Sequence, residues 1–380
     1  MENLVNNINM SEKLKKAFFN IPVLVTGHTG FKGSWLSIWL LDLGAKVIGY
    51  SLDPPTNPSN FSLCRMNNKM IDIRGDIRDA EKFEKVLQEY KPEIIFHLAA
   101  QPIVLKSYEH PHETFDINVR GTLNVLEAVR KSPSVKTLLI ITTDKCYKDQ
   151  EALWGYRESD HLGGDDPYSA SKAMAELAIA SYRKSFFQNT NSSTIAVASA
   201  RAGNVVGGGD FAEFRLVPDA MKAILSKKPI LIRSPQSIRP WQSVLVPLSG
   251  YLWLAAKLQE ERHTHAEAWN FGPPEVSGIT SKEIVEKIIE LWGEGSWKHL
   301  QIETPKKETF LLRLNWEKAA HYLKWRPVYT WEDAVQETVS WFKAYAKEIN
   351  NPNIDLYSIC TQHIQDYTEL AKQHRVAWAC

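Results

Sequence analysis

Residues 23–36 read VLVTGHTGFKGSWL and decide how this chain is expected to fold. An apolar, β-branched run suited to a buried strand leads into a turn with glycines at 27, 30 and 33, and an apolar helical pattern follows at 34–43. In such a turn, glycine lets the backbone approach a pyrophosphate, and the first N–H groups of the helix direct partial positive charge toward the anion. The stretch therefore predicts a dinucleotide site, with an ordinary βα turn as the alternative.

Outward from this turn, short β-branched runs alternate with longer segments of helical spacing. That rhythm is typical of repeated βαβ units around a parallel sheet. The expected strands lie at 22–26, 46–51, 70–74, 93–98, 136–142 and 194–200. We therefore predict an α/β fold with a Rossmann-type doubly wound parallel sheet and a second, smaller α/β lobe that binds the substrate.

The end of the second expected strand decides between NAD and NADP. A carboxylate there holds the ribose 2′-hydroxyl, whereas a cation accepts a 2′-phosphate. Counting from Gly27 places Ser51 at the usual acidic position; Asp53 lies two residues later, and no Arg or Lys follows until Arg65. The pattern favours NAD and leaves open whether Ser51 or Asp53 meets the ribose.

Other cofactor contacts are expected from the glycine turn and from the loops that follow the third, fourth and fifth strands. The predicted cofactor-binding residues are Gly27, Thr29, Gly30, Phe31, Lys32, Gly33, Asp53, Asp76, Ile77, Leu98, Ala99, Ala100, Asn118, Thr142, Tyr168 and Lys172.

The regular alternation ends near residue 203, where Gly-rich loops and Pro-punctuated stretches begin. A helical pattern near 234–262 is predicted to return to the first domain. The predicted organisation is a leader at 1–20, an NAD-binding Rossmann domain at 21–203, a mainly substrate-binding lobe at 204–345 and a tail at 346–380.

Composition argues against several classes of protein. Lys and Arg number 45 against 44 acidic residues, so no general positive field draws the chain to nucleic acid or to an anionic membrane. The densest apolar run, at 35–41, is far shorter than the ~20 residues that cross a bilayer. The four cysteines form no CxxC pair, and no histidine spacing matches a metal motif. We expect a protein of the reducing cytoplasm without a metal, a nucleic-acid partner or a membrane span.

Tyr168 and Lys172 are expected on one face of a helix. They are four residues apart, and Asp166-Pro167 before them suits a cap and a first helical turn. A lysine ammonium and a positive nicotinamide ring beside a tyrosine stabilise phenolate and lower a pKa that starts near ~10. Tyr168 is therefore predicted to accept a hydroxyl proton as hydride leaves, and a solvated surface pair is the alternative.

Thr143-Asp144-Lys145 follows an apolar strand and should emerge at the carboxyl edge of the sheet, where α/β proteins bind ligands. Thr143 is expected to hydrogen-bond a substrate hydroxyl, and Asp144 and Lys145 are a candidate acid and base. Because successive strand residues point to opposite faces, both can enter one site only if the chain turns there. The alternative is that Asp144 caps the next segment and that Lys145 faces solvent.

The chain resembles the CDP-glucose 4,6-dehydratases, a branch of the extended short-chain dehydrogenase/reductase superfamily. The likeness covers nearly the whole chain up to Tyr345 and includes a lysine at 145, where the dTDP-glucose and GDP-mannose branches have glutamate. Asn315 departs from the family, whose members often have Asp there. The motifs that carry the likeness are TGHTGFKGSWL at 26–36, TTDKCY at 142–147, YSASK at 168–172, RAGNVVGGGD at 201–210 and RPWQSV at 239–244.

The resemblance implies a redox-neutral dehydration of CDP-glucose to CDP-4-keto-6-deoxyglucose in deoxysugar and lipopolysaccharide biosynthesis. Tyr168 would take the C4 hydroxyl proton while hydride passes from C4 to NAD. Lys145, as a neutral amine, would remove the C5 proton, and Asp144 would protonate the departing C6 hydroxyl before hydride returns to C6.

The diphosphate of the substrate needs cations or amide donors. The resemblance places Asn204 against a phosphate, and Arg239 lies in a stiff loop that suits a bidentate guanidinium. Arg215 is a third candidate, equally readable as a solvated side chain.

Two rival functions use the same fold. A sugar-nucleotide 4-epimerase needs Tyr168 and Lys172 but no pair to expel water, so Asp144 and Lys145 favour the dehydratase. A cofactor-sensing regulator often lacks the tyrosine or the lysine, and this chain has both.

A homodimer is expected from the helix that begins near Pro111 and the helix that holds Tyr168. Ala173, Ala178 and Ala180 permit close approach of helices, and two-fold pairing is the commonest closed arrangement.

Overall fold

The computed structural model describes residues 12–150, 154–188, 195–274, 278–301, 312–350 and 354–380. Their centre is a parallel sheet of seven described strands in the order β11-β6-β5-β4-β1-β2-β3. The predicted α/β fold class is confirmed. The strands are β1 (Pro22–Thr26), β2 (Lys46–Ser51), β3 (Ile71–Arg74), β4 (Ile94–His97), β5 (Thr137–Ile141), β6 (Ala196–Ala202) and β11 (Ala268–Phe271).

The strand order reverses beside β1. The chain runs outward from β1 to β2 and β3 and then returns to β4 on the other side of β1. In open parallel sheets a crevice forms at such a switch point, beyond the carboxyl ends of the strands. The glycine turn follows β1 directly, so the fold places it at this crevice.

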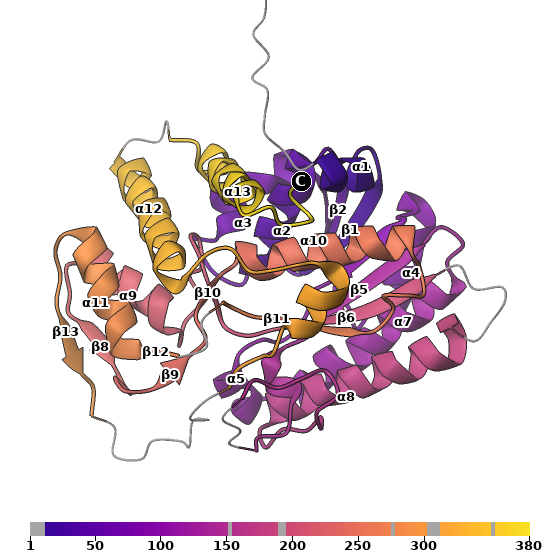
Figure 1. The fold of residues 1–380 in the computed structure, drawn as a ribbon, viewed down its shortest axis with the longest axis horizontal. Helices are drawn as coiled ribbons and strands as arrows, with labels where there is room; N and C mark the ends of the chain where they lie inside the picture. The colour runs from indigo at the N-terminus through magenta and orange to yellow at the C-terminus, as the bar shows by residue number, and fades with distance from the viewer. Residues whose placement is uncertain (1–11, 151–153, 189–194, 275–277, 302–311, 351–353) are drawn as a thin grey trace, which may run out of the picture.

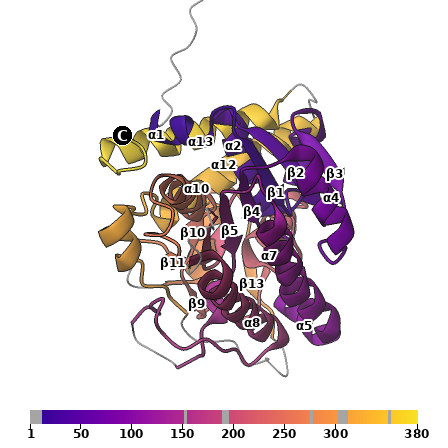
Figure 2. The ribbon, with the colours of Figure 1, turned by 90° about the vertical axis from the view of Figure 1, so that its right-hand side faces the viewer.

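Helices cover both faces of the sheet. Leu24 faces a core shared with α4 (Ala80–Tyr90), α7 (Gly121–Lys131) and α8 (Pro167–Tyr182). The neighbouring residues of β1, Val23 and Val25, face the opposite core, which includes the apolar residues of α2 (Phe31–Asp42) and α10 (Leu245–Glu260). Figure 2 shows α7 and α10 on opposite sides of the strands. Burial on both faces explains why these strands read as continuous apolar runs.

Several short helices join the main elements. The helix expected near Pro111 begins there as α6 and continues through a π-helical turn, η2, into α7. These segments are α3 (Asn60–Leu63), η1 (Met66–Asn68), α5 (Val104–Glu109), α6 (Pro111–Phe115), η2 (Asp116–Arg120), η3 (Asp144–Cys146), η4 (Arg183–Gln188) and η5 (Ala319–Leu323).

A second group of elements lies to one side of the sheet, on the left of Figure 1. It contains three short strand pairs, β7 with β10, β8 with β13 and β9 with β12, of which only the last is antiparallel. The division of the chain at residues 203 and 345 stays a prediction. The elements are β7 (Val205–Val206), α9 (Leu216–Leu225), β8 (Ile230–Ile232), β9 (Ile238–Arg239), β10 (Gln242–Ser243), β12 (Ile279–Thr280), α11 (Ser281–Trp292), β13 (Trp297–His299) and α12 (Trp331–Asn350).

Both ends of the described chain form packed helices. The predicted leader contains α1 (Glu12–Phe18), which buries Leu14 and Phe18 and contacts α10, while residues 1–11 lie outside the described residues. The predicted tail shows no clear sequence period, yet it forms α13 (Leu356–Gln373) against α2 and α12. The packing of α13 explains the difference, since tertiary contacts stabilise a helix more than its own propensity does.

The glycine turn is held by backbone packed directly on backbone. Gly27 has a φ of +73°, and a Cβ there would lie 2.8 Å from the backbone nitrogen of Ala99. A Cβ on Gly33 would collide with the carbonyl oxygen of Gly27. No side-chain rotation relieves either contact. The spacing of these glycines is therefore a steric requirement of the turn itself.

We predict that Gly27→Ala destabilises the protein more than Gly293→Ala does. Both glycines have left-handed backbone, which costs an alanine about 1–2 kcal/mol, but nothing lies within 4 Å of a Cβ on Gly293. The clash with Ala99 should add about 1–3 kcal/mol to the loss at Gly27. Urea unfolding of both variants measures the difference, and equal losses would show that the turn can move away from β4.

Candidate active site

One large cavity runs from the glycine turn to the side group of elements. Its volume is about 1240 Å³. All of the predicted site residues except Asn118 line it. Those that line it are Gly27, Thr29, Gly30, Phe31, Lys32, Gly33, Asp53, Asp76, Ile77, Leu98, Ala99, Ala100, Thr142, Thr143, Asp144, Lys145, Tyr168, Lys172, Asn204, Arg215 and Arg239.

Asn118 corrects one prediction. It lies in η2 behind the wall of the cavity, and its side chain is buried. Its Nδ2 donates to the Ser171 hydroxyl at 2.9 Å, and its Oδ1 accepts from the backbone N–H of Gln101 at 2.9 Å. Asn118 therefore links η2, the loop after β4 and α8, and has no free polar atom to offer a cofactor.

At one end of the cavity the glycine turn is tied to the neighbouring strands. The hydroxyls of Thr29 and Ser51 lie 2.8 Å apart, and His28 Nε2 lies 2.8 Å from Asp72 Oδ1. Burial lowers the pKa of His28 despite that carboxylate. The end of β2 is thus fixed against the turn, as a ribose-binding position requires.

The expectation that no cation lies near Asp53 is wrong. Arg74, at the end of β3, places its Nε 3.3 Å from Asp53 Oδ1 and its Nη2 2.9 Å from Asp72 Oδ2. Arg74 is 21 residues from Asp53 in sequence. It lies beside Asp53 because β3 pairs in parallel with β2, which ends just before Asp53. The Asp53 side chain is 90% exposed, so this pair contributes little stability.

The second predicted carboxylate at this end is already engaged. The two oxygens of Asp76 accept hydrogen bonds from the Arg78 guanidinium, the shortest at 2.6 Å, and Asp76 Oδ1 also accepts from the Arg78 backbone N–H. These hydrogen bonds lower the pKa of Asp76. The neighbouring Ile77, which also lines the cavity, offers an apolar surface for the adenine ring of a cofactor.

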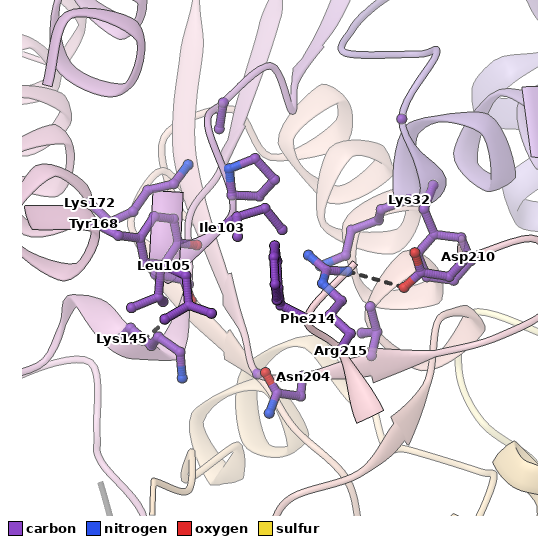
Figure 3. A pocket seen from close by; sticks show the side chains of 18 of the residues that line it. Lys32, Ile103, Leu105, Lys145, Tyr168, Lys172, Asn204, Asp210, Phe214 and Arg215 are labelled. Atoms are coloured by element: carbon purple, nitrogen blue, oxygen red, sulfur yellow. Dashed lines mark hydrogen bonds and ion pairs between the residues drawn. The ribbon is translucent and has the colours of Figure 1, made fainter. Parts of the chain in front are cut away.

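Helix α8 presents Tyr168 and Lys172 to the cavity as predicted. Asp166 caps the helix by accepting from the Ser169 backbone N–H at 3.0 Å, and Pro167 occupies the first helical position. Figure 3 shows the two side chains on the same side of the cavity. Both are largely buried, which excludes the alternative of a solvated surface pair.

Burial raises the pKa of Tyr168 to about 12, while a hydrogen bond with Thr143 acts in the opposite direction. The lowering expected from Lys172 together with a nicotinamide ring stays a prediction. Burial also lowers the pKa of Lys172 to about 8, against the charge of Glu176. The lysine and the tyrosine of the protein alone therefore both favour their neutral forms more than in water.

The chain turns after β5, as the acid–base hypothesis requires. The 3-10 turn η3 begins at Asp144, and the Thr143 hydroxyl caps it by accepting from the Lys145 backbone N–H at 3.3 Å and donates to Asp144 Oδ1 at 2.9 Å. Asp144 is buried and Lys145 is half-buried, and both line the cavity. A Cβ on Gly203 would lie 2.9 Å from Asp144 Oδ2, so a larger residue where β6 ends would displace the Asp144 carboxylate.

A buried ion pair behind α8 was not predicted. Arg201 Nη2 lies 2.7 Å from Glu176 Oε2, and the hydroxyls of Thr142 and Ser199 donate to the same carboxylate at 2.5 and 2.9 Å. Burial alone would raise the pKa of Glu176, but Arg201 and the hydroxyls lower it below its ordinary value. Glu176 follows Lys172 by four residues, so helical spacing could have predicted that Glu176 lies next to Lys172 on α8.

Cations gather at the other end of the cavity. Figure 3 shows Lys32 and Arg215 side by side, with Asn204 below them. Arg215 Nη1 lies 3.1 Å from Asp210 Oδ2, and burial together with Arg215 lowers the pKa of Lys32 to about 8. Phe214, with a φ of +64°, stands between this group and Ile103 and was also missed. This end suits an anionic group.

Two further observations concern the described residues alone. They contain no group of three or more His, Cys, Asp or Glu side chains arranged to hold a metal ion. None of the described helices is both long and apolar enough to cross a membrane.

Known proteins resemble this chain in sequence and in fold. Residues 24–338 match the family described as GDP-mannose 4,6 dehydratase. The chain is 46% identical to the CDP-glucose 4,6-dehydratase of Salmonella typhimurium, over 91% of this chain and 95% of that one. The dTDP-glucose 4,6-dehydratase of Bacillus anthracis, solved with NAD, aligns with a TM-score of 0.69 at 25% identity, over 86% and 98% of the two chains. A UDP-glucose 4-epimerase of Thermotoga maritima shares the fold, with a TM-score of 0.73 at 23% identity over 86% and 99%.

We predict that Arg201→Met lowers the free energy of unfolding by about 3–5 kcal/mol, because it leaves Glu176 as an uncompensated buried charge. Arg130→Met is the control: its ion pair with Glu127 has the same 2.7 Å distance but is exposed, so it should lose no more than about 1 kcal/mol. Guanidinium unfolding measures both. A loss at Arg201 no larger than at Arg130 would mean that water reaches Glu176.

Proposed function

This chain belongs to the GDP-mannose 4,6-dehydratase family, and from that premise we propose that it is a hydro-lyase that converts CDP-glucose to CDP-4-keto-6-deoxyglucose. The observation that carries the proposal is that one cavity joins Tyr168 and Lys172 to Asp144 and Lys145. An epimerase needs only the first pair, whereas removal of water also needs an acid and a base. The 46% identity to a CDP-glucose 4,6-dehydratase supports the choice of substrate.

The residues around the glycine turn fit NAD. The turn and the start of α2 offer bare backbone to a pyrophosphate. At the ribose end, the exposed Asp53 carboxylate lines the cavity beside Arg74, whose guanidinium is also paired with Asp72. Asp53 can accept from a ribose hydroxyl, and Asp72 offsets the charge of Arg74 that would otherwise favour a 2′-phosphate. When bound, NAD supplies the acceptor and then the donor of the hydride, and its ring charge opposes the burial that keeps Tyr168 neutral.

The protein side chains would move three protons. Tyr168 takes the proton of the C4 hydroxyl. The Thr143 hydroxyl, which donates to Asp144 in the structure, would turn its proton toward Tyr168 to stabilise the phenolate. The resulting 4-keto group makes the C5 proton acidic, and Lys145 removes it. Asp144 then protonates the C6 hydroxyl as it leaves, and Lys145 returns its proton to C5 when the hydride is returned to C6. These assignments place the sugar between α8 and η3.

The diphosphate would lie at the cationic end. Arg215 is held by Asp210, so its guanidinium is positioned in advance and loses little entropy on binding. Arg239 lines the same end, and its Nη1 donates to the Ile238 carbonyl at 2.8 Å. Asn204 completes the set as an amide donor.

We also infer a cytoplasmic location, a role in deoxysugar and lipopolysaccharide biosynthesis, and no nucleic-acid partner. The free state of all four cysteines is consistent with a reducing compartment. The product, a 4-keto-6-deoxy sugar nucleotide, is an activated precursor for further sugar modification.

The direct experiment offers purified protein CDP-, dTDP-, UDP- and GDP-linked hexoses in turn. We expect the 4-keto-6-deoxy product from CDP-glucose without net consumption of NAD. A product from another nucleotide sugar but not from CDP-glucose would refute the substrate, and interconversion at C4 without loss of water would favour the epimerase.

We predict that Lys145→Ala separates oxidation from elimination. The variant keeps Tyr168 and Lys172, so reduced cofactor should accumulate on addition of CDP-glucose, while 6-deoxy product falls by ~10²–10⁴-fold. Absorbance of reduced nicotinamide and product chromatography measure the two steps. Tyr168→Phe is the matched control, because loss of the first base should abolish both signals.

Two results would contradict these roles. Dehydration by Lys145→Ala at nearly the original rate would make Lys145 an electrostatic neighbour. More than about a tenth of the original rate in Tyr168→Phe would exclude Tyr168 as the base, since a general base contributes ~10²–10⁴-fold.

The proposed homodimer uses the exposed face of α8 and the helix that begins at Pro111. Ala173 must be removed from the predicted interface, because it is buried within the chain in a core cluster that also contains Leu312 and Leu314. Met174 and Leu177 instead expose large apolar side chains on α8. Helix α8 contacts the helix that begins at Pro111, so the outer faces of the two helices would form one continuous interface.

We predict that Leu177→Glu converts a dimer into a 43.3 kDa monomer. A charge at the centre of an apolar two-fold interface is repeated in both copies and cannot be solvated there. Ile349→Glu on α12 is the control, since Ile349 is 59% exposed and Leu177 60%. Sedimentation equilibrium at micromolar concentration measures the masses, and a monomeric unmodified protein would refute the dimer.

A further inference from the structure

The cavity extends beyond the cationic end, between the first turn of α9 and β8. Its lining there includes Pro218, Asp219, Leu231 and Arg233. If the sugar lies at α8 and the diphosphate at Arg215, the nucleoside of the substrate must occupy this extension. This placement of the nucleoside rests on the proposed function, and it makes the lining of the extension responsible for recognising the base.

Asp219 is the unusual residue of this extension. It lies in the first turn of α9 and is half-buried, yet its carboxylate has no hydrogen-bond or ion-pair partner in the described part of the chain. Asp210 nearby is different, because it pairs with Arg215 and accepts from the Ala212 backbone N–H at 3.0 Å. The Asp219 carboxylate thus faces the cavity as an unused acceptor.

Its surroundings favour a neutral hydrogen-bond donor as the partner. Burial raises the pKa of Asp219, while Lys222 and Arg233 act in the opposite direction without forming an ion pair with it. A half-buried carboxylate loses part of its hydration and regains stability by accepting a hydrogen bond. A diphosphate cannot provide one, so the donor has to be elsewhere on the nucleotide.

Cytosine carries such a donor where the other pyrimidines do not. Its 4-amino group donates hydrogen bonds, whereas uracil and thymine have an oxygen acceptor at the same position. A carboxylate accepts from the first and repels the second. We propose that Asp219 selects cytosine by accepting a hydrogen bond from the 4-amino group of the base.

The ribose hydroxyls are the competing donors in the same ligand. They are identical in CDP and UDP, whereas the group at position 4 differs. The two assignments therefore differ in one measurable quantity, which is the ratio of the affinities for CDP and UDP.

The test measures dissociation constants for CDP and UDP by calorimetry with the full chain. We expect the unmodified protein to prefer CDP, and Asp219→Asn to weaken CDP binding by ~10–100-fold. UDP should bind at least as tightly as before, because the amide can donate to the uracil oxygen and one negative charge near the diphosphate is gone. Glu286→Gln, an exposed carboxylate of α11 that does not line the cavity, controls for net charge and should leave the ratio unchanged.

The binding measurements test the role of Asp219 independently of the catalysed reaction. Equal weakening of CDP and UDP would assign the carboxylate to the ribose and overturn the proposal, as would an unchanged ratio or equal affinities in the unmodified protein. Asp219→Ser, expected to lose the same preference, replaces the first variant if thermal unfolding shows that Asp219→Asn does not fold. Turnover of CDP-glucose by the unmodified protein tests the proposed function, so a failure there is distinguishable from an unaltered CDP-to-UDP ratio.

Discussion

The contact of backbone with backbone at the glycine turn is the constraint on which this structure depends. Gly27 leaves room for the loop after β4, and Gly33 leaves room for the carbonyl of Gly27. These two contacts allow α2 to begin directly at the carboxyl end of β1. They also fix the position of the cavity wall at the switch point of the sheet. Larger residues would separate α2 from the sheet, because close-packed backbone has no rotamer to adjust.

Around that wall, burial controls the chemistry of the site. The Tyr168 phenol and the Lys172 ammonium are both shifted toward their neutral forms because little water reaches them. Glu176 stays ionised behind them because Arg201 and two hydroxyls satisfy it. The fixed negative charge at Glu176 partly counteracts the loss of charge on Lys172, so the ion pair supports the site without entering it.

The second group of elements, beside the sheet, completes the cavity with charged side chains. Lys32 comes from α2 and Arg215 from the loop before α9, so the cationic end exists only when both parts of the fold are assembled. Asp210 fixes Arg215, and Asp219 remains available. Under the proposed function, the same short segment would offer one cation for a diphosphate and one acceptor for a base, and it would couple recognition of these two parts of the nucleotide.

The sequence by itself determined six strands of the central sheet, the strand–turn–helix unit and the shared face of Tyr168 and Lys172, since these depend on neighbours within a few residues and on fixed helical and strand periods. The edge strand β11 was not predicted. The packing of α13, the approach of Arg74 to Asp53, and the inward positions of Asn118 and Ala173 were decided only by the tertiary structure. They depend on which elements lie side by side, which local periodicity does not encode. The same holds for the pKa of Tyr168, because burial is a property of the whole fold and not of the motif.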